Sequence, residues 1–380
     1  MHTVTWQHMD TDPQSPAMSE PQLGLPPGLH VLRDVVMDFS PAYFAMVMAT
    51  GIVSLSTQML GMPRLAVALF RLNVAAYAGI CLLTLLRVLW FKNLVLHDLV
   101  DHQRGSGFFT SVAGSCILGS QFILTSAHYQ AATGLWILAI VLWVLLTYTI
   151  FAAFTIKEHK PTLYEGITGA WLLAVVATQA IAALSALIAL HWNQPYRLMI
   201  NFFGLSMWLW GGMLYIWMIS LIFYRYTFFR FSPTDLAPPY WINMGAMAIS
   251  TLAGARLIVN SPDAPFLRSL LPFLKGFTVF YWATGTWWIP MLAILAAWRY
   301  IYKRSPLRYD PLYWGAVFPL GMYTACTLQM ALAMELDFLI VLPRVFIYVA
   351  LGAWLATFAG LCRTLLGGLL GLLRRQGLVK

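Results

Sequence analysis

Hydroxyl side chains inside long apolar segments are the residues of this sequence whose type and placement best suit contact with a ligand. They are Thr50, Ser54, Ser115, Ser250, Thr251 and Thr324. A hydroxyl can donate a hydrogen bond to a passing anion, and because it carries no charge the contact stays weak enough for release. The same hydroxyl can instead bond to the backbone carbonyl one turn earlier in a helix. Both roles are open for each of these residues.

Acidic side chains and histidines are missing from the middle of every long apolar segment. Transporters that couple to protons usually carry such a group at membrane depth, so its absence favours a passive pore. Zinc motifs of the His-Glu-x-x-His type, phosphate-binding glycine loops and nucleophile elbows are also missing, and the four cysteines lack the spacing of metal ligands. We therefore expect no enzyme activity, no cofactor and no bound metal.

Arg256 is the charged residue placed deepest in an apolar segment, one helical turn before the end of the span predicted at 240–260. A cation there could attract anions at the outer mouth of a pore. Alternatively, its long side chain reaches the lipid headgroups, or it pairs with Glu335 or Asp337 on the same side of the membrane. The sequence leaves these roles open.

Ten long apolar segments must position these residues. Charged residues make up only 10% of the chain and hydrophobic residues 60%, so lipid is the solvent for most of it. We assign the membrane spans to 41–60, 65–91, 108–128, 131–154, 165–190, 197–224, 240–260, 272–300, 313–333 and 342–366. Each span is near or above the roughly 20 residues that a helix needs to cross the hydrocarbon core. The sequence therefore predicts an all-α membrane protein.

Polar tails flank the transmembrane domain, which extends over 41–366. Residues 1–40 are rich in proline and lack the features of a signal peptide, so we expect a disordered cytosolic tail. Residues 367–380 form a basic tail at the other end. Ten spans place both tails on one side, and most of the 23 Lys and Arg residues lie in these tails and in the loops on that side. The positive-inside rule then predicts cytoplasmic termini and a multi-pass protein of the cell (inner) membrane.

Composition alternates between odd-numbered and even-numbered spans. The odd spans are richer in Gly, Ala, Ser and Thr, although the contrast fades in the last two pairs. They also hold Gly51, Gly114, Gly169, Gly254, Pro319 and Gly321. Membranes tolerate a disturbed helix backbone only where protein or a wet cavity satisfies it, so the odd helices should lie inside. Five out-and-back hairpins would then enclose a narrow channel lined by these glycines and the hydroxyls above; a solid bundle with tight packing is the alternative.

Particular strings in these spans resemble one known family of transporters. They are PAYFAMVMATGIVSLSTQML (41–60), RGSGFFTSVAGSCILGSQ (104–121), MGAMAISTLAG (244–254), YWATGTWWIPML (281–292) and WGAVFPLGMYTACT (314–327). Together they resemble the tellurite-resistance/dicarboxylate transporter family over roughly residues 38 to 366. That family includes yeast malate permeases and sulfite pumps, a bacterial tellurite-resistance channel homologue and plant slow anion channels.

The resemblance implies a fold and a gate. The fold is five helical hairpins in a quasi-fivefold arrangement around a central pore, with the odd helices inside and three subunits in a homotrimer. In channel members a phenylalanine before a proline on the ninth helix plugs the pore, and Phe318 with Pro319 matches that position. Without the resemblance, Phe318 would be one of 23 phenylalanines, most of which are expected only to pack.

These observations lead to one expected function with an alternative. We expect passive or gated transport of small inorganic or organic anions across the bilayer, through a neutral pore plugged by Phe318. The alternative is a proton-coupled carrier of malate-like dicarboxylates, or an exporter of sulfite or tellurite-type oxyanions. The basic residues are scattered over many short loops, so we expect no nucleic acid as a partner.

Overall fold

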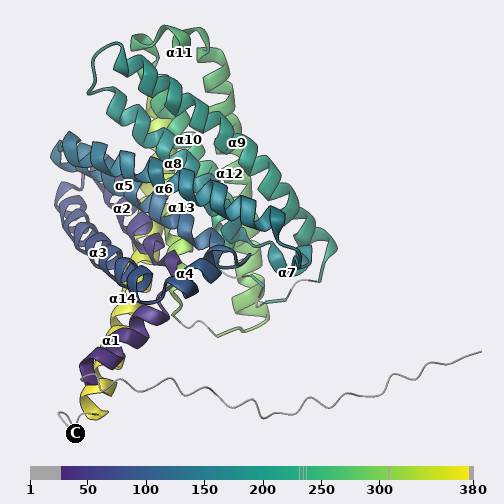
Figure 1. Ribbon diagram of the computed structural model, residues 1–380. Helices are drawn as coiled ribbons and strands as arrows, with labels where there is room; N and C mark the ends of the chain where they lie inside the picture. Colours follow the sequence, from purple (N-terminus) through teal and green to yellow (C-terminus); the bar gives the residue numbers. More distant parts are fainter. Residues whose placement is uncertain (1–26, 231, 234, 237, 307–308, 376–380) are drawn as a thin grey trace, which may run out of the picture.

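The computed structural model describes residues 27–230, 232–233, 235–236, 238–306 and 309–375 of the chain (Figure 1). Helices are the only regular secondary structure in these residues, and ten helical segments are long and apolar enough to cross a membrane. They begin and end within a few residues of the predicted spans. The prediction of an all-α protein with ten membrane spans is therefore confirmed.

The ten long helices fall into two sets that alternate along the chain. The helices that form the first, third, fifth, seventh and ninth membrane spans are called the ring helices. They are α2 (Phe44–Met59), α5 (Phe109–Ser126), α8 (Leu173–Ala189), α10 (Ile242–Asn260) and α13 (Trp314–Met334). The helices that form the second, fourth, sixth, eighth and tenth membrane spans are called the outer helices. They are α3 (Pro63–Trp90), α6 (Tyr129–Ile156), α9 (Tyr196–Phe228), α12 (Leu271–Ala297) and α14 (Val341–Arg375). The short helices are α1 (Pro27–Met37), α4 (Lys92–Leu99), α7 (Leu163–Gly166) and α11 (Pro265–Ser269).

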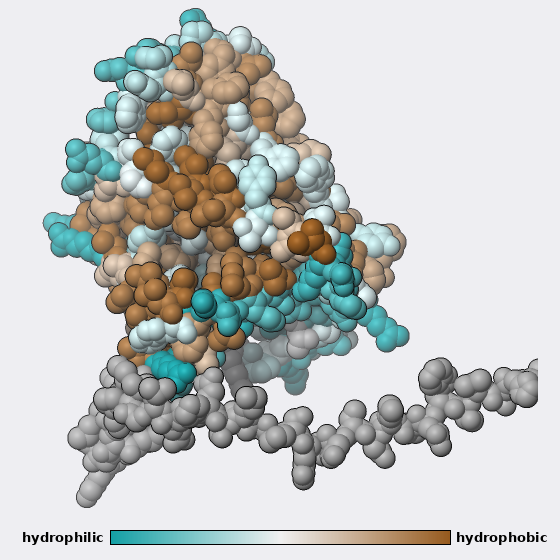
Figure 2. Space-filling view, viewed as in Figure 1, coloured by the Kyte–Doolittle hydropathy of each residue, from teal (hydrophilic) through white to brown (hydrophobic). Residues whose placement is uncertain are grey.

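Burial separates the ring helices from the outer helices. In the most apolar stretch of each span, 72–94% of the residues are buried in the odd set and 17–50% in the even set. The prediction that the odd helices lie inside is thus confirmed. Small side chains let neighbouring backbones approach closely, whereas the Leu-rich and Trp-rich faces of the outer helices suit lipid. Figure 2 shows apolar side chains spread over the middle of the visible face, and polar ones toward the end that carries α4 and α7.

Contacts between helices close the ring. Each ring helix packs against the next one along the chain, and α13 packs against α2. Each outer helix packs against the ring helix that precedes it, so the five predicted hairpins are present. These contacts are what a quasi-fivefold arrangement requires of neighbours; the symmetry itself stays a prediction.

Every ring helix begins with a short 3₁₀ turn. These turns are η1 (Pro41–Tyr43), η2 (Gly105–Phe108), η3 (Gly169–Leu172), η4 (Pro238–Trp241) and η7 (Pro311–Tyr313). Side chains before three of them accept hydrogen bonds from the free backbone N–H groups of the first turn: Ser40, Thr168 and Asp310. Such caps satisfy donors that have no partner inside the helix, so the helix starts are fixed by local sequence.

The chain ends differ from the sequence-based expectation in part. Residues 27–37 of the tail expected to be disordered form α1, and the following Phe39 is buried in a cluster with Phe44 and Ile80. Burial of these apolar side chains favours order there. At the other end α14 continues to Arg375, into the predicted tail. Residues 1–26 and 376–380 lie outside the described residues. The described ends, α1 and the end of α14, lie at the same end of the molecule (Figure 1).

Candidate functional site

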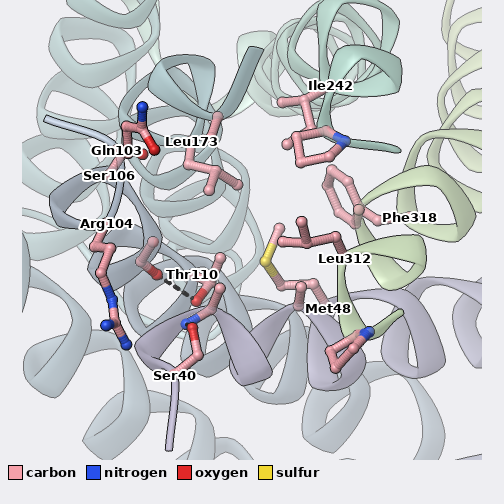
Figure 3. A pocket seen from close by; sticks show the side chains of 17 residues that line it. Ser40, Met48, Gln103, Arg104, Ser106, Thr110, Leu173, Ile242, Leu312 and Phe318 are labelled. Atoms are coloured by element: carbon pink, nitrogen blue, oxygen red, sulfur yellow. Dashed lines mark hydrogen bonds between the residues drawn. The ribbon is translucent and has the colours of Figure 1, made fainter. Parts of the chain in front are cut away.

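The first turns of all five ring helices surround one cavity of about 250 Å³, which we call the first-turn cavity. Each ring helix contributes at least one lining side chain: Met48 from α2, Thr110 from α5, Leu173 from α8, Ile242 from α10 and Phe318 from α13. Figure 3 shows these side chains pointing toward a common space. Because five separate segments meet here, the cavity is a product of the tertiary fold.

Phe318 lies one turn into α13 and is 1% exposed. Its side chain shares the cavity with those of Met48 and Ile242 (Figure 3). The following residue, Pro319, packs against Gly245 of α10, where an added Cβ would lie 2.7 Å from the Pro319 Cγ. That close contact between α10 and α13 fixes the backbone on which Phe318 is carried. The phenylalanine therefore both lines the cavity and belongs to the hydrophobic core.

Most polar groups of the first-turn cavity come from the residues before and within α5, and Ser40 before α2 adds one more. The Ser106 hydroxyl is buried and has no hydrogen-bond partner in the described part of the protein. The Thr110 hydroxyl lies within bonding distance of two carbonyls, Pro41 O at 3.0 Å and Gly107 O at 2.7 Å. Arg104 also lines the cavity, half exposed, with its Nε 3.2 Å from the Asp98 carboxylate. We did not single out these residues from the sequence, although they belong to the string 104–121 that carries the resemblance.

The last turns of the same five helices surround a second cavity of about 200 Å³, which we call the last-turn cavity. Its lining includes Met59 from α2, Leu124 from α5, Leu187 from α8, Arg256 from α10 and Gln329 from α13. The two cavities therefore lie at opposite ends of the ring. A route between them would run along the axis that the ring helices enclose.

Arg256 is 5% exposed, so its side chain is buried and does not reach for the surface. Its Nη1 donates to the carbonyl of Ala183 in α8 at 3.0 Å. Its Nη2 is buried and has no hydrogen-bond partner within the described ranges. No ion pair joins it to Glu335 or Asp337, or to any other carboxylate in the described part of the chain. Arg256 therefore lines the last-turn cavity, and the pairing with an acidic residue that the sequence allowed is not formed in the described part of the chain.

Two of the predicted lining hydroxyls are directed at the outer helix α3. Ser54 Oγ donates to Ala66 O at 2.8 Å. Ser115 Oγ lies 2.7 Å from Tyr77 Oη and donates to Ser111 O one turn earlier. These bonds tie α2 and α5 to α3, on the outside of the ring.

The other four hydroxyls are bonded within the bundle. Thr50 Oγ1 accepts from Trp354 Nε1 of α14 at 3.0 Å. Ser250, Thr251 and Thr324 donate to the carbonyl one turn back, at 2.7, 2.8 and 3.1 Å. None of the six predicted hydroxyls lines either cavity. Their role as pore lining stays a prediction.

The predicted lining glycines lie where helices approach closely. At Gly321 an added Cβ would lie 2.9 Å from Ile52 Cγ2 of α2, and at Gly169 it would lie 2.8 Å from Pro239 O. Gly51, Gly114 and Gly254 likewise face neighbouring segments, and none of the five lines either cavity. Small residues at such contacts allow tight helix packing, which was the alternative to pore lining. Tight packing between the ring helices and a pore inside them are compatible, because the packing sets the diameter of the ring of helices.

Arg225 and Asp235 join three segments near the first-turn cavity. Arg225, near the end of α9, donates to Asp235 Oδ1 at 3.2 Å and to Tyr164 O at 2.9 Å, and it also bonds the Tyr240 hydroxyl. Burial by itself raises the pKa of Asp235, but hydrogen bonds from Ser232 and the charge of Arg225 outweigh it and lower the pKa. The carboxylate is therefore stabilised in its charged form.

Comparison with known proteins identifies the relatives of this chain. The family described as voltage-dependent anion channel matches residues 38–362. An uncharacterized transporter of Methanocaldococcus jannaschii is 28% identical over 302 residues, 77% of this chain and 83% of that protein. A sulfite efflux pump of Arthroderma benhamiae is 26% identical over 354 residues, 85% of this chain and 90% of the pump. An uncharacterized membrane protein of Mycobacterium tuberculosis is 39% identical over 148 residues, 39% of this chain and 75% of that protein.

Proposed function

Since this chain belongs to the voltage-dependent anion channel family, we propose that it moves small anions passively across the cell membrane, through the ring of five helices, with Phe318 as the gate. The observation that carries the proposal is the position of Phe318 in the lining of the first-turn cavity. An aromatic ring across a narrow neutral lumen excludes water, so anions pass only when the ring moves or the lumen widens. Pro319 disturbs the backbone beside the gate.

The first-turn cavity has a polarity that suits anions. The N-terminal ends of five helices meet there, and each carries a partial positive charge of about half an elementary charge. The Ser106 hydroxyl, which has no partner among the described residues, adds a neutral donor, and the half-exposed Arg104 adds a cation that is paired with Asp98 at the rim. Attraction without a tight binding cage allows entry and release, which conduction requires.

Assembly and orientation are part of the proposal. We propose a homotrimer with one pore in each subunit, as the resemblance implies, and cytoplasmic termini. The charge distribution over the loops supports this orientation, because most Lys and Arg residues lie on the side that carries the described ends. The first-turn cavity would then open to the cytoplasm and the last-turn cavity to the outside.

The test is efflux of a panel of anions from proteoliposomes that contain the full chain. Chloride, nitrate, sulfite and malate are loaded in turn, with and without an imposed proton gradient. We expect flux that follows the anion gradient alone, and protein-free liposomes serve as the control. Uptake that requires the proton gradient would instead identify a coupled carrier.

Export of sulfite is the second candidate function. Curated relatives that match 85% of this chain are named sulfite efflux pumps. The monovalent form of sulfite, bisulfite, could cross a neutral pore by the same route as chloride. Sulfite flux that exceeds chloride and nitrate flux by about tenfold would favour this narrower function, because tenfold corresponds to 1.4 kcal/mol of discrimination.

A further inference from the structure

Arg256 is a buried cation without a counter-ion in the described part of the chain. One nitrogen of its guanidinium donates to the Ala183 carbonyl, while the other has no partner. The nearby Asp263 is engaged by Arg197 Nη1 at 3.0 Å. A buried charge is costly unless it is paired and hydrogen-bonded. The arrangement therefore calls for an anion that the chain itself does not supply.

The helix ends around Arg256 explain why a cation is needed at this place. The last-turn cavity is lined by the C-terminal ends of the five ring helices. Carbonyl groups there carry partial negative charge, which by itself repels an anion from this end of the ring. The charge of Arg256 offsets that repulsion, since it is the one charged residue among the described residues that line the cavity.

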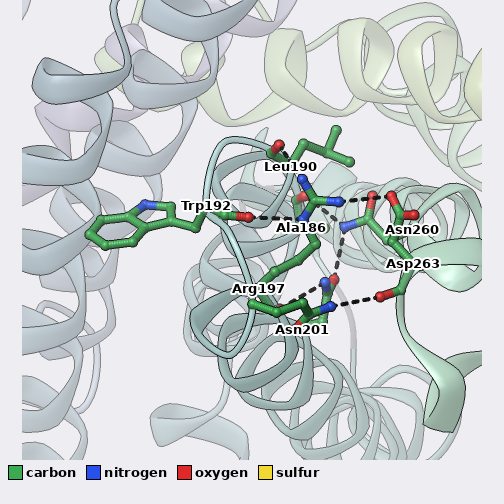
Figure 4. A network of polar contacts seen from close by, with 8 residues as sticks. Ala186, Leu190, Trp192, Arg197, Asn201, Asn260 and Asp263 are labelled. Atoms are coloured by element: carbon green, nitrogen blue, oxygen red, sulfur yellow. Dashed lines mark hydrogen bonds and ion pairs between the residues drawn. The ribbon is translucent and has the colours of Figure 1, made fainter.

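The end of α10 that carries Arg256 is held rigidly (Figure 4). Asn260 Nδ2 donates to Ala186 O and to Asn201 Oδ1, both at 2.8 Å. Arg197 in turn donates to the Leu190 carbonyl at 3.1 Å and pairs with Asp263. These bonds connect α8, α9 and α10, so the Arg256 side chain projects from a fixed frame. A preorganised donor loses little entropy when a ligand binds.

We propose that the last-turn cavity is a binding site for one small monovalent anion, held by the free Nη2 of Arg256. Gln329 lines the same cavity and offers a neutral amide donor, because its Nε2 has only the weak acceptor Met59 Sδ at 3.9 Å. A monovalent anion balances the single charge of Arg256. A dianion would leave a net negative charge in a buried site, so the site should discriminate against sulfate and dicarboxylates.

The inference rests on the proposed function, because it describes a second anion site on the same route. Binding and transport can nevertheless be measured separately. Thermal unfolding of the full chain in detergent reports binding, since an anion that binds only the folded state raises the unfolding temperature with concentration. Efflux from proteoliposomes reports transport. The variants are Arg256→Gln, Arg256→Lys and, as control, Arg344→Gln, which removes an exposed cation at the same end of the ring.

In the binding experiment chloride replaces gluconate at constant ionic strength. We expect the unfolding temperature of the wild type and of Arg344→Gln to rise with chloride. Arg256→Gln should need about tenfold more chloride for the same rise, equivalent to the loss of one charge-assisted hydrogen bond. Arg256→Lys keeps the charge and should lie between them, which gives a readout if Arg256→Gln does not fold. Sulfate should stabilise the wild type less than chloride does.

The contrary outcomes are distinct. Equal chloride dependence in the wild type and Arg256→Gln, or none in the wild type, would overturn the site. Stronger stabilisation by sulfate than by chloride, lost in Arg256→Gln, would overturn its monovalent selectivity. If the wild type transports no anion but binds chloride through Arg256, the proposed function fails and the site stands. If the wild type transports anions and the chloride concentration for half-maximal flux is unchanged in Arg256→Gln, the transport role of the site fails and the proposed function stands.

Discussion

Phe318 combines two roles that its surroundings make compatible. It is buried in the hydrophobic core and also lines the cavity where five helix starts meet. A residue with only a packing role would stabilise the fold without controlling passage. If Phe318 is a gate, removal of its phenyl group should raise flux; if it only packs, the same change should leave flux unchanged or lower it.

The variant Phe318→Ala should raise anion flux by about tenfold, equivalent to about 1.4 kcal/mol of barrier, because the constriction is lost. Efflux from proteoliposomes measures the change. Phe109→Ala is the matched control, since Phe109 is an equally buried phenylalanine of a ring helix that does not line the cavity. Both variants should lose stability, on the order of 3–5 kcal/mol for a large core truncation. Unchanged or reduced flux in Phe318→Ala would count against the gate.

Hydroxyl groups on the ring helices and their first turns differ in whether they already donate a hydrogen bond within the protein. The Ser106 hydroxyl has no hydrogen-bond partner among the residues that the structure describes, whereas the Thr324 hydroxyl donates to Leu320 O. We expect Ser106→Ala to raise the anion concentration for half-maximal flux about tenfold, as for the loss of one hydrogen bond to a charged group. Thr324→Val should change it little, because that proton is already used. Titration of flux with chloride compares the two; a larger effect at Thr324 would contradict this assignment.

At the scale of elements, one ion pair connects an outer helix to the loop before the next ring helix. Arg225 of α9 contacts Asp235, and its other bonds reach Tyr164 and Tyr240 at the starts of α7 and α10. These four residues line a further cavity, which shares the lining residues Gln103 and Pro239 with the first-turn cavity. Arg225 thereby connects α9 to α7 and to the 3₁₀ turn at the start of α10.

The lowered pKa of Asp235 predicts a pH dependence of stability. Because the folded-state pKa lies below the ordinary value of 3.8, the carboxylate stabilises the fold above that value, and this contribution is lost as pH falls through the folded-state pKa. The unfolding temperature of the wild type should therefore exceed that of Asp235→Asn at pH 6. The difference should shrink as the pH is lowered toward 3. A difference that grows with acid would contradict the assignment.

The alternation of ring and outer helices holds over the whole molecule. Large apolar side chains are exposed on the outer helices, among them Leu89 of α3, Tyr148 of α6 and Phe202 of α9. Lipid or neighbouring subunits must cover these faces in a membrane. The proposed pore and the proposed contacts between subunits would therefore use different faces of the molecule.

The proposed homotrimer is tested by the mass of the purified protein. We expect a particle whose protein mass is three times the 42.7 kDa of one chain, measured by native mass spectrometry after removal of detergent. We expect the exposed faces of the outer helices to supply the contacts between subunits. A single-chain mass in several mild detergents, with anion transport retained, would show that a trimer is not needed for function.

Sequence alone determined the ten spans, their pairing into hairpins and the interior position of the odd helices. These features follow from composition averaged over some twenty residues, where the solvent preference of each side chain adds to that of its neighbours. The starts of α2, α8, α10 and α13 are similarly local, because a proline or a capping side chain stands at the first turn of each.

Only the tertiary structure decided which polar side chains face a cavity. Ser54 lies within the first span and its hydroxyl donates to Ala66 O. Ser106 lies just before the third predicted span and lines the first-turn cavity, where its hydroxyl has no partner among the described residues. Likewise the sequence did not decide between several partners for Arg256. In the fold its Nη1 donates to the Ala183 carbonyl, and its Nη2 has no partner among the described residues. The rotation of each ring helix about its axis decides these outcomes, and packing against the neighbouring helices sets that rotation, whatever the residue's own type.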